Sequence, residues 1–212
     1  MEQKKLKLSA YCDQVKDKST KILIVVDYQK DFVTGVLAVP GAKDINRIIQ
    51  QEIYSDKYDY IIYTMDTHMP KDYEGSEEGK IFPFHCEYKT EGWEPYRIYT
   101  YNEGVEVIDS SNSNSKRKDI TKNKEFMFIK DKFNIWEGNN CYESWFLKNF
   151  AKDSKIRVVG VAENYCVYEN VMGLIKRGYL NVSILKKAVA GIPDNTLEER
   201  RAEMKNIGVK YR

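Results

Sequence analysis

The sequence predicts an α/β protein with three layers (αβα), in which helices cover both faces of a doubly wound, mainly parallel sheet. Two observations lead to this fold class. Short apolar runs rich in β-branched residues alternate along the chain with longer segments whose apolar residues recur at helical spacing. The apolar runs are nearly continuous, which is typical of strands buried on both faces. Strands and helices that alternate in this way build a parallel sheet.

The first half of the chain is expected to hold two strands and one helix. Residues 22–26 read Ile-Leu-Ile-Val-Val, and residues 60–64 read Tyr-Ile-Ile-Tyr-Thr. Both runs combine high β-propensity with few polar residues, so each is predicted to be a buried strand. Between them, over residues 42–55, isoleucines recur three and four positions apart, which predicts a helix with one apolar face.

The second half of the chain repeats the alternation. The expected elements, in chain order, are a strand at 126–129, a helix at 139–151, a strand at 156–161, a helix at 165–177, a strand at 182–185 and a helix at 194–206. Gly178 follows the second of these helices as a stop signal, and Pro193-Asp194 opens the last one.

Length and charge limit the function classes. A chain of 212 residues suits one domain, here residues 1–212. With 34 basic and 32 acidic residues the net charge is +2, too small to attract nucleic acid or an anionic membrane surface. No stretch of 18 consecutive apolar residues occurs and the start is polar, so we expect a cytoplasmic protein without a membrane span.

Two segments and the cysteines lie outside the alternating pattern. Residues 1–20 are expected to be a charged leader, and residues 110–124, rich in Ser, Asn and Lys, a polar loop or insertion. The four cysteines show no CxxC spacing, so in a reducing compartment they are expected to be thiols.

Four side chains that could take part in catalysis are expected at one edge of the sheet. Asp27 and Asp66 close the first and second strands, Lys130 closes the third, and Cys166 follows the fourth at the predicted start of a helix. In an open parallel sheet the ligand crevice lies outside the carboxyl ends of the strands. The sequence therefore predicts an active site at this edge.

Each of three residues at this edge has a chemical role and a structural alternative. Cys166 is the candidate nucleophile, because a helix N-terminus and a nearby ammonium would favour a thiolate near neutral pH. Asp27 could take the thiol proton and deliver it to a leaving amine, while Lys130 balances the charges. The alternatives are a small buried cysteine, a capping aspartate and a surface lysine.

Other chemistries fit the sequence less well. A tyrosine phosphatase needs Arg six positions after the cysteine, where this chain has Met172. A Cys/His protease needs an imidazole beside the thiol, but both histidines lie in an acidic segment of their own. The phosphate-binding patterns GxGxxG and GxxxxGK[ST] are absent, so a nucleotide-binding function lacks its usual loop.

The two histidines suggest a metal site. His68 and His85 share their segment with Asp66 and Glu78, and Asp66 and His68 would face the same side of an extended chain. Together these side chains are a plausible ligand set for Zn²⁺, Fe²⁺, Mn²⁺ or Co²⁺. The alternative is a chance grouping of polar loop residues.

Three separated motifs resemble the isochorismatase-like cysteine hydrolases. Residues 26–32 (Val-Asp-Tyr-Gln-Lys-Asp-Phe) resemble the opening of that superfamily, and residues 159–167 (Val-Gly-Val-Ala-Glu-Asn-Tyr-Cys-Val) resemble its nucleophile segment. Residues 66–68 together with 78–86 are similar to the metal-binding stretch of its nicotinamidase branch. The resemblance spans residues 21–190 and implies the same α/β fold.

The resemblance implies roles for individual residues. The implied catalytic triad is Asp27, Lys130 and Cys166. The implied metal ligands are Asp66, His68 and His85, with Glu78 as a fourth ligand in part of the family. A cis peptide between Val161 and Ala162 would direct the backbone N–H groups of Ala162 and Cys166 at an oxyanion. The implied substrate-binding residues are Phe32, Phe82 and Tyr165.

The function implied by the resemblance is a metal-dependent nicotinamidase, which hydrolyses nicotinamide to nicotinic acid and ammonia through a cysteine thioester. Such an enzyme would bind one divalent metal ion, with zinc as the first candidate, and a small amide as its substrate. The family often forms homo-oligomers, so a homo-oligomer is expected as an option. Alternatives are another amidase or hydrolase of the superfamily, or a catalytically silent relative. Glu163-Asn164 stands where relatives usually carry Thr-Asp, and a Glu163 side chain that points inward would disfavour the thiolate or alter substrate choice.

Overall fold

The computed structural model describes residues 19–98, 106–108 and 124–212. Residues 1–18 of the expected leader and residues 110–123 of the expected polar insertion lie outside the described residues. Within the described ranges, no helix combines the length and the apolar character that crossing a membrane requires.

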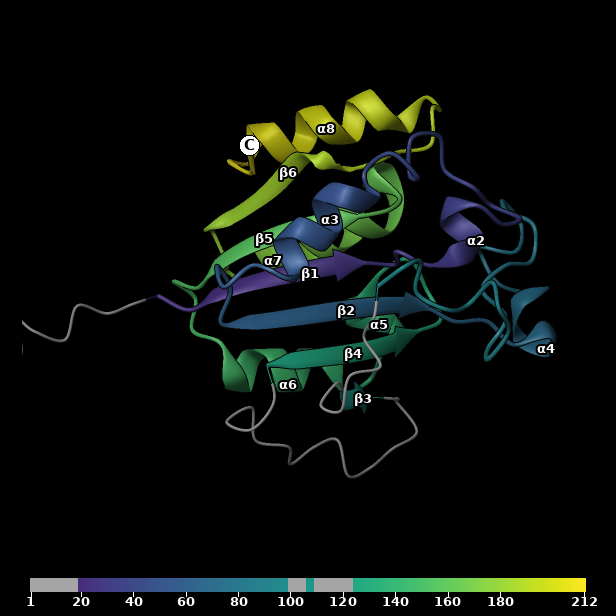
Figure 1. Cartoon of the computed structure of the whole chain (residues 1–212), viewed down its shortest axis with the longest axis horizontal. Coiled ribbons are helices and arrows are strands. Elements are labelled where there is room, and N and C mark those ends of the chain that lie inside the picture. Colours follow the sequence, from purple (N-terminus) through teal and green to yellow (C-terminus); the bar gives the residue numbers. More distant parts are fainter. Residues whose placement is uncertain (1–18, 99–105, 109–123) are drawn as a thin grey trace, which may run out of the picture.

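The described residues form a seven-stranded sheet in which every neighbouring pair is parallel (Figure 1). Its order is β3-β4-β2-β1-β5-β6-β7. The strands are β1 (Lys21–Val26), β2 (Tyr60–Asp66), β3 (Glu106–Ile108), β4 (Glu125–Lys130), β5 (Lys155–Gly160), β6 (Val182–Val189) and β7 (Lys210–Tyr211). All five predicted strands are present. β3 and β7 were not predicted, because runs of three and two residues are too short to show a hydrophobic pattern.

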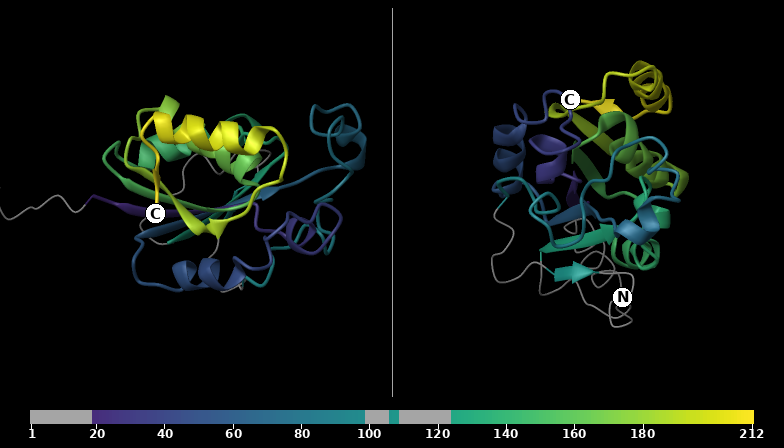
Figure 2. Two further views of the ribbon diagram at one scale, coloured as in Figure 1. Left: turned by 90° about the horizontal axis from the view of Figure 1, so that it is seen from above. Right: turned by 90° about the vertical axis from the view of Figure 1, so that its right-hand side faces the viewer.

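Helices cover both faces of the sheet, so the predicted three-layer arrangement is confirmed (Figure 2). On one face lie α2 (Lys30–Val33) and α3 (Asn46–Ile53); on the other lie α5 (Ile135–Gly138), α6 (Tyr142–Asn149), α7 (Tyr168–Lys176) and α8 (Thr196–Asn206). Alternate residues of β1 supply both cores: Ile22 and Ile24 pack toward α5 to α8, while Leu23 packs toward α3. A strand buried on both sides therefore has to be continuously apolar, as observed.

The helices differ from the predictions mainly at their ends. The helix predicted at 165–177 begins instead with a π-helical turn (Glu163–Val167) that continues into α7. Three four-residue helices were missed, namely α2, α4 (Pro70–Tyr73) and α5, because one turn carries no measurable period. α4 lies beyond the carboxyl end of the sheet, on the right in Figure 1.

The strand order places a ligand crevice at the predicted edge. From β1 the chain proceeds to β2 on one side, and it later crosses to β5 on the other side of β1. The loops after β1 and β5 therefore leave in opposite directions, which opens a crevice at their carboxyl ends. Asp27 and the segment carrying Cys166 follow these two strands directly.

Candidate active site and metal centre

Asp27 is held rigidly at the end of β1. Its backbone adopts a φ of 45°, an uncommon conformation that aspartate tolerates better than most residues. The Asp27 N–H donates to the Thr64 carbonyl over 3.1 Å, and the Thr64 hydroxyl donates to Asp27 Oδ1 over 2.6 Å. The carboxylate is completely buried, so its second oxygen, Oδ2, is fixed in the crevice.

Lys130 joins the two aspartates and the cysteine. It ends β4 beside Asp66 in the parallel register and is almost completely buried. Its Nζ lies 2.8 Å from Asp27 Oδ2, 2.8 Å from Asp66 Oδ1 and 3.5 Å from Cys166 Sγ. A buried ammonium would be costly alone, and two carboxylates offset that cost. The sequence-predicted group of Asp27, Asp66, Lys130 and Cys166 is thus brought together in space.

Cys166 lies within the π-helical turn that follows β5. The Val161–Ala162 peptide bond before this turn is cis, as the resemblance implied. Gly160 has a φ of +116°, and a Cβ at this position would collide with the carbonyl oxygen of Val26. Only glycine therefore lets the end of β5 pass so close to β1. Among the described residues, no acceptor receives a hydrogen bond from the Ala162 N–H.

Burial and charge set the protonation of the crevice. Burial raises the pKa of Asp27, an effect that the Lys130 ammonium opposes. Burial also acts to raise the pKa of Asp66, but Lys130 and the two histidines hold it well below its usual range. Although burial lowers the pKa of an ammonium, Asp27 and Asp66 keep the pKa of Lys130 well above its usual value.

The expected lowering of the Cys166 pKa is not found. Burial raises the pKa of the Cys166 thiol well above its ordinary value, and Lys130 only partly compensates because the Asp27 and Asp66 carboxylates act in the opposite direction. A raised pKa favours the thiol over the thiolate, so a nearby base that accepts the proton would assist attack by the sulfur.

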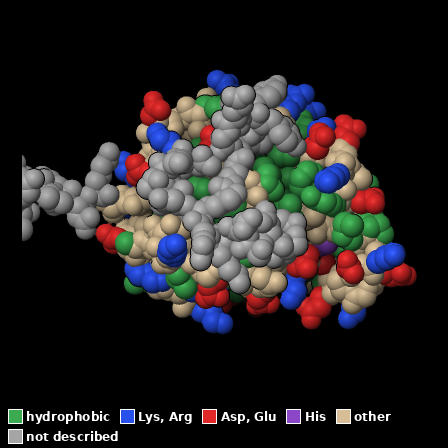
Figure 3. Space-filling model, turned by 90° about the horizontal axis from the view of Figure 1, so that it is seen from below, with side chains coloured by type: hydrophobic (Ala, Val, Ile, Leu, Met, Phe, Trp, Pro, Cys, Tyr) green, Lys and Arg blue, Asp and Glu red, His purple; other side chains and the backbone are tan. Residues whose placement is uncertain are grey.

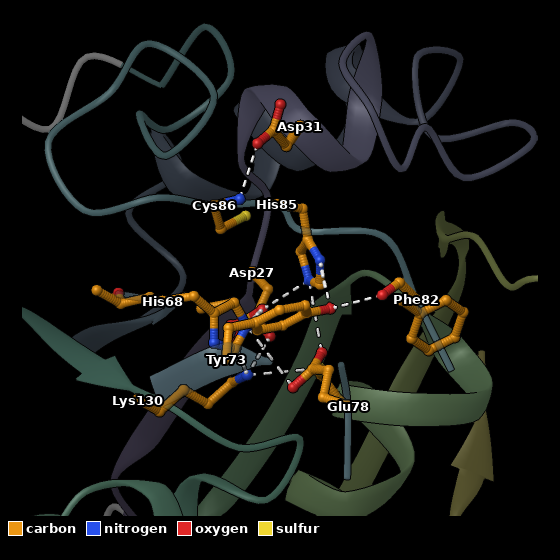
Figure 4. Close-up of polar contacts among 12 residues, drawn as sticks. Asp27, Asp31, His68, Tyr73, Glu78, Phe82, His85, Cys86 and Lys130 are labelled. Carbon is orange, nitrogen blue, oxygen red and sulfur yellow. Dashed lines mark hydrogen bonds and ion pairs between the residues drawn. The ribbon is translucent and has the colours of Figure 1, made fainter. Parts of the chain in front are cut away.

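The four predicted metal-ligating side chains converge on one buried point, and Figure 4 labels three of them, His68, Glu78 and His85. Asp66 Oδ2 lies 2.9 Å from His68 Nε2 and 3.1 Å from His85 Nε2. Glu78 completes the group, with Oε1 3.5 Å from His85 Nε2 and Oε2 3.7 Å from His68 Nε2. One ligand atom from each residue lies within 4.8 Å of all the others. The alternative of a chance grouping in a polar loop does not account for this convergence.

The chemistry of this cluster fits a divalent cation. Within the described part of the chain, Glu78 Oε2 is buried without a hydrogen-bond partner, which is costly unless a cation balances it. Burial alone would lower the pKa of His85, yet its contacts with Asp66 and Glu78 raise it to about 10, so the site attracts positive charge strongly. His85 Nδ1 lies 2.7 Å from the Pro83 carbonyl, which directs Nε2 toward the cluster.

The structure adds supporting residues that the sequence did not single out. The Tyr73 hydroxyl of α4 lies 3.2 Å from His85 Nδ1 and donates to the Pro83 carbonyl over 3.0 Å. The Gln29 side chain makes two 2.8 Å hydrogen bonds with the backbone of Asp66. Gln29 lies in the motif at residues 26–32, so its role could have been suspected from the sequence. Nothing in the sequence distinguished Tyr73 from the other tyrosines.

The predicted substrate-binding aromatics fall into two places. Phe32 is buried, with its ring centroid 5.1 Å from that of His85. Phe82 and Tyr165 contact each other at 5.1 Å, and Phe133, which was not predicted, joins them at 6.1 Å and 5.4 Å. The rings of Phe82, Tyr165 and Phe133 therefore form one half-buried aromatic cluster.

A cleft of about 750 Å³ opens beside the metal-ligating cluster. The buried residues His68, Tyr73 and Glu78 are among those that line it. Its other charged lining residues are mostly acidic: Asp72, Glu77, Asp131, Glu137 and Glu169, with Lys132 as the single cation. In Figure 3 a small histidine surface is visible right of centre, with acidic side chains near it. Cys166 is not among the lining residues, so it lies deeper than this opening.

Glu163 points away from the nucleophile. Its buried carboxylate pairs with Arg201 of α8, with Nε 3.0 Å from Oε1 and one terminal nitrogen 2.5 Å from Oε2, and it accepts a hydrogen bond from Tyr211 over 3.1 Å. Asn164 bonds to residues 192–196 through both ends of its amide. The departure from the usual Thr-Asp therefore attaches the nucleophile turn to the C-terminal segment.

The sequence is similar to known proteins over most of its length. The isochorismatase domain matches residues 21–210. The chain is 26% identical over 192 residues to a probable inactive nicotinamidase of Arabidopsis thaliana, with 89% of each chain covered. It is 26% identical over 199 residues to a nicotinamidase of Saccharomyces cerevisiae, covering 78% of this chain and 86% of that one.

Solved structures share the fold. The crystal structure of a pyrazinamidase of Pyrococcus horikoshii in complex with zinc superposes with a TM-score of 0.70 at 24% identity, covering 91% of this chain and 98% of the other. At this identity the likeness concerns the fold. Because the family match extends from β1 to β7, this chain belongs to the isochorismatase family.

Proposed function

We propose that this protein is a metal-dependent nicotinamidase of the cytoplasm, which hydrolyses nicotinamide to nicotinic acid and ammonia through a thioester on Cys166. The observation that supports this most strongly is the position of Asp66, whose two oxygens contact Lys130 on one side and both histidines on the other. A cysteine hydrolase centre and a metal-ligating cluster are thereby joined in one buried site. The yeast nicotinamidase among the relatives favours the same substrate.

The metal would be held by Asp66, His68, Glu78 and His85. Mixed carboxylate and imidazole ligands suit zinc, which the related pyrazinamidase binds, and also Fe²⁺, Mn²⁺ or Co²⁺. When bound, a divalent ion supplies Lewis-acid chemistry and a coordination position for a substrate nitrogen.

The first half of the reaction forms the thioester. Asp27 takes the proton of the Cys166 thiol as the sulfur forms a bond to the amide carbon, and Lys130 stays within reach of both groups. The backbone N–H groups of Ala162 and Cys166 are suited to bind the oxyanion, a contribution worth about 10²–10³ in rate. The C–N bond then breaks, and Asp27 returns the proton to the leaving nitrogen, which departs as ammonia.

The second half releases the acid. Asp27 accepts a proton from water while the water oxygen attacks the thioester carbon. The C–S bond breaks, the sulfur recovers a proton, and nicotinic acid leaves. The raised pKa of Asp27 suits a carboxylate that alternately accepts and donates a proton.

Replacing the nucleophile tests this proposal. We expect Cys166→Ala to abolish ammonia release from nicotinamide while the metal content stays that of the unchanged protein. Cys141→Ala, which alters another buried cysteine, is the matched control and is expected to retain activity. Ammonia release by Cys166→Ala at the rate of the unchanged enzyme would contradict the proposal.

A second candidate is an amidase of the same family with a different small amide as its substrate. The acidic lining of the cleft favours it, because five carboxylate side chains besides Glu78 would attract a cationic amide more than neutral nicotinamide. Ammonia release across a panel of neutral, cationic and anionic amides separates the two candidates. A silent relative is disfavoured by the intact arrangement of Asp27, Lys130 and Cys166.

A further inference from the structure

A second cavity, of about 390 Å³, lies at the opposite edge of the sheet from the active site. It opens at the amino ends of β1, β5, β6 and β7, toward the left-hand end of the sheet in Figure 1. Six basic residues and no acidic residue line it: Lys21, Lys57, Lys155, Arg157, Lys210 and Arg212. The whole chain has a net charge of only +2, so this concentration of cations is local.

The strand register places most of these cations on one face. Lys21 pairs with Lys155, and Arg157 pairs with Ser183, which in turn pairs with Lys210. Directly paired residues of parallel strands project to the same side of the sheet, and so do residues two positions apart. This is the face that α3 covers further along, where Leu23 and Val159 are buried. The basic side chains thus emerge where the helical cover ends.

The protein neutralises the cations of this cavity only in part, because Glu52 is the one carboxylate that acts on them among the described residues: it pairs with Lys57, and Arg157 is near enough to help lower its pKa. Lys57 pairs with Glu52 Oε1 over 2.8 Å, and the Tyr58 hydroxyl bonds to the other Glu52 oxygen. As far as the structure describes the chain, the other five basic residues have no carboxylate within 4.0 Å of their nitrogens. Like charges on directly paired strand positions, such as Lys21 and Lys155, are destabilising. An anion bound between them would remove that repulsion.

We propose that this basic cavity binds a small, multiply charged phosphate compound. Arginine and lysine side chains around a hollow are the usual means of binding phosphate oxygens, and the half-buried Arg157 provides a planar group for two of them. The volume suits a ligand of the size of a short polyphosphate or one nucleotide. No residue of the active site lines this cavity, so the proposal does not depend on the proposed function.

Binding of tripolyphosphate to the full-length protein, measured by titration calorimetry at low salt, tests the proposal. We expect saturable binding, weakened at least about tenfold in Lys155→Gln/Arg157→Gln. Lys186→Gln/Lys187→Gln is the matched control, since it removes two exposed lysines of β6 that do not line the cavity, and it should bind normally. Arg157→Lys keeps the charge but loses the planar guanidinium group. If the double variant does not fold, weaker binding of tripolyphosphate by Arg157→Lys tests the proposal instead.

Two further measurements identify the ligand class. ATP tested beside tripolyphosphate distinguishes a nucleotide from inorganic phosphate, and bound ligand should raise the melting temperature of the unchanged protein. The proposal is overturned if no saturable binding occurs up to millimolar tripolyphosphate, or if the control variant loses as much affinity as the cavity variant. Tighter binding of an RNA oligonucleotide than of either small ligand would also overturn it, in favour of a nucleic-acid surface.

Discussion

Asp66 is the residue on which both parts of the site depend. One of its oxygens accepts from the Lys130 ammonium over 2.8 Å, and the other lies within 3.1 Å of both imidazoles. The same buried carboxylate therefore stabilises the charge of Lys130 and, in the proposed function, would be a metal ligand. A neutral side chain of equal size at this position would disturb both.

We accordingly predict that Asp66→Asn loses its metal and most of its activity. The amide leaves the buried Lys130 with Asp27 alone, and breaking a buried ion pair costs about 3–5 kcal/mol. Metal analysis of the purified variant and its urea unfolding midpoint measure the two effects. Asp153→Asn, an exposed aspartate, should change neither; a metal-replete Asp66→Asn would show that Asp66 is not a ligand.

Tyr73 is expected to affect metal binding less than Asp66 does. Its hydroxyl lies 3.2 Å from His85 Nδ1 and holds the Phe82 and Pro83 carbonyls, so it orients the imidazole without reaching the cluster itself. We predict that Tyr73→Phe weakens metal affinity about 10–100-fold. Activity should return when excess metal is added, which metal titration of the chelator-treated enzyme will show. Activity that stays low at saturating metal would assign Tyr73 a different role.

At the scale of elements, the nucleophile turn depends on the C-terminal helix. Glu163 in the π-helical turn is bound by Arg201 of α8 and Tyr211 of β7, and Asn164 is bound to the segment before α8. The ends of this network are 48 positions apart in the sequence. No local pattern around Cys166 could therefore have shown what positions it.

We predict that Glu163→Gln lowers both stability and the rate of Cys166 alkylation. Loss of a charge-assisted hydrogen-bond pair costs about 2 kcal/mol, and the freed turn no longer holds the sulfur toward Lys130. The measurements are the thermal midpoint and the rate of reaction with an alkylating reagent. Glu198→Gln removes the exposed partner of the same arginine and should cost less than about 1 kcal/mol. Alkylation at an unchanged rate in a destabilised Glu163→Gln would reduce Glu163 to a purely structural role.

The turn after α3 offers a test by pH. Burial acts to raise the pKa of Glu52, but Lys57 and Tyr58 hold it below its usual value, so the folded protein favours the charged form. This stabilisation is present above the unfolded pKa of about 4.3 and is lost as the pH falls through the lower folded value. The difference in melting temperature between the unchanged protein and Glu52→Gln should therefore be seen at neutral pH and shrink in acid. A constant difference would refute the linkage.

At the scale of the molecule, the sequence was sufficient to predict the fold class and the edge of the sheet where the site residues meet. Continuous apolar strands alternating with helices determine a parallel sheet, and such a sheet brings the ends of its strands to one edge. That geometry alone predicts that Asp27, Asp66 and Lys130 lie close together. The direction of the Cys166 pKa shift did not follow, because burial and the charges of residues up to 139 positions away in the sequence determine it.

In the described part of the chain, the two hollows at opposite edges of the sheet are lined by charges of opposite sign. Acidic residues line the cleft at the carboxyl edge and basic residues line the cavity at the amino edge, although the net charge is close to zero. Neither feature appears in the composition, because each is assembled from segments far apart in the chain. Only the folded sheet separates the two signs of charge.

The polarity predicts which amides the active site excludes. A substrate entering past Asp72, Asp131 and Glu137 meets a negative potential, so we expect a lower kcat/KM for an amide bearing a carboxylate than for a neutral one of the same shape. The difference should diminish as salt screens the cleft, over a Debye length of about 10 Å at 0.1 M ionic strength. At low salt, the difference in kcat/KM between the two amides should be smaller in the double variant Asp131→Asn/Glu137→Gln. It should be unchanged in the control Lys186→Gln/Lys187→Gln, whose residues do not line the cleft. The measurement is kcat/KM for a neutral and an anionic amide of the same shape at two salt concentrations. If the ratio of the two kcat/KM values is the same at both concentrations, shape and not charge selects the substrate.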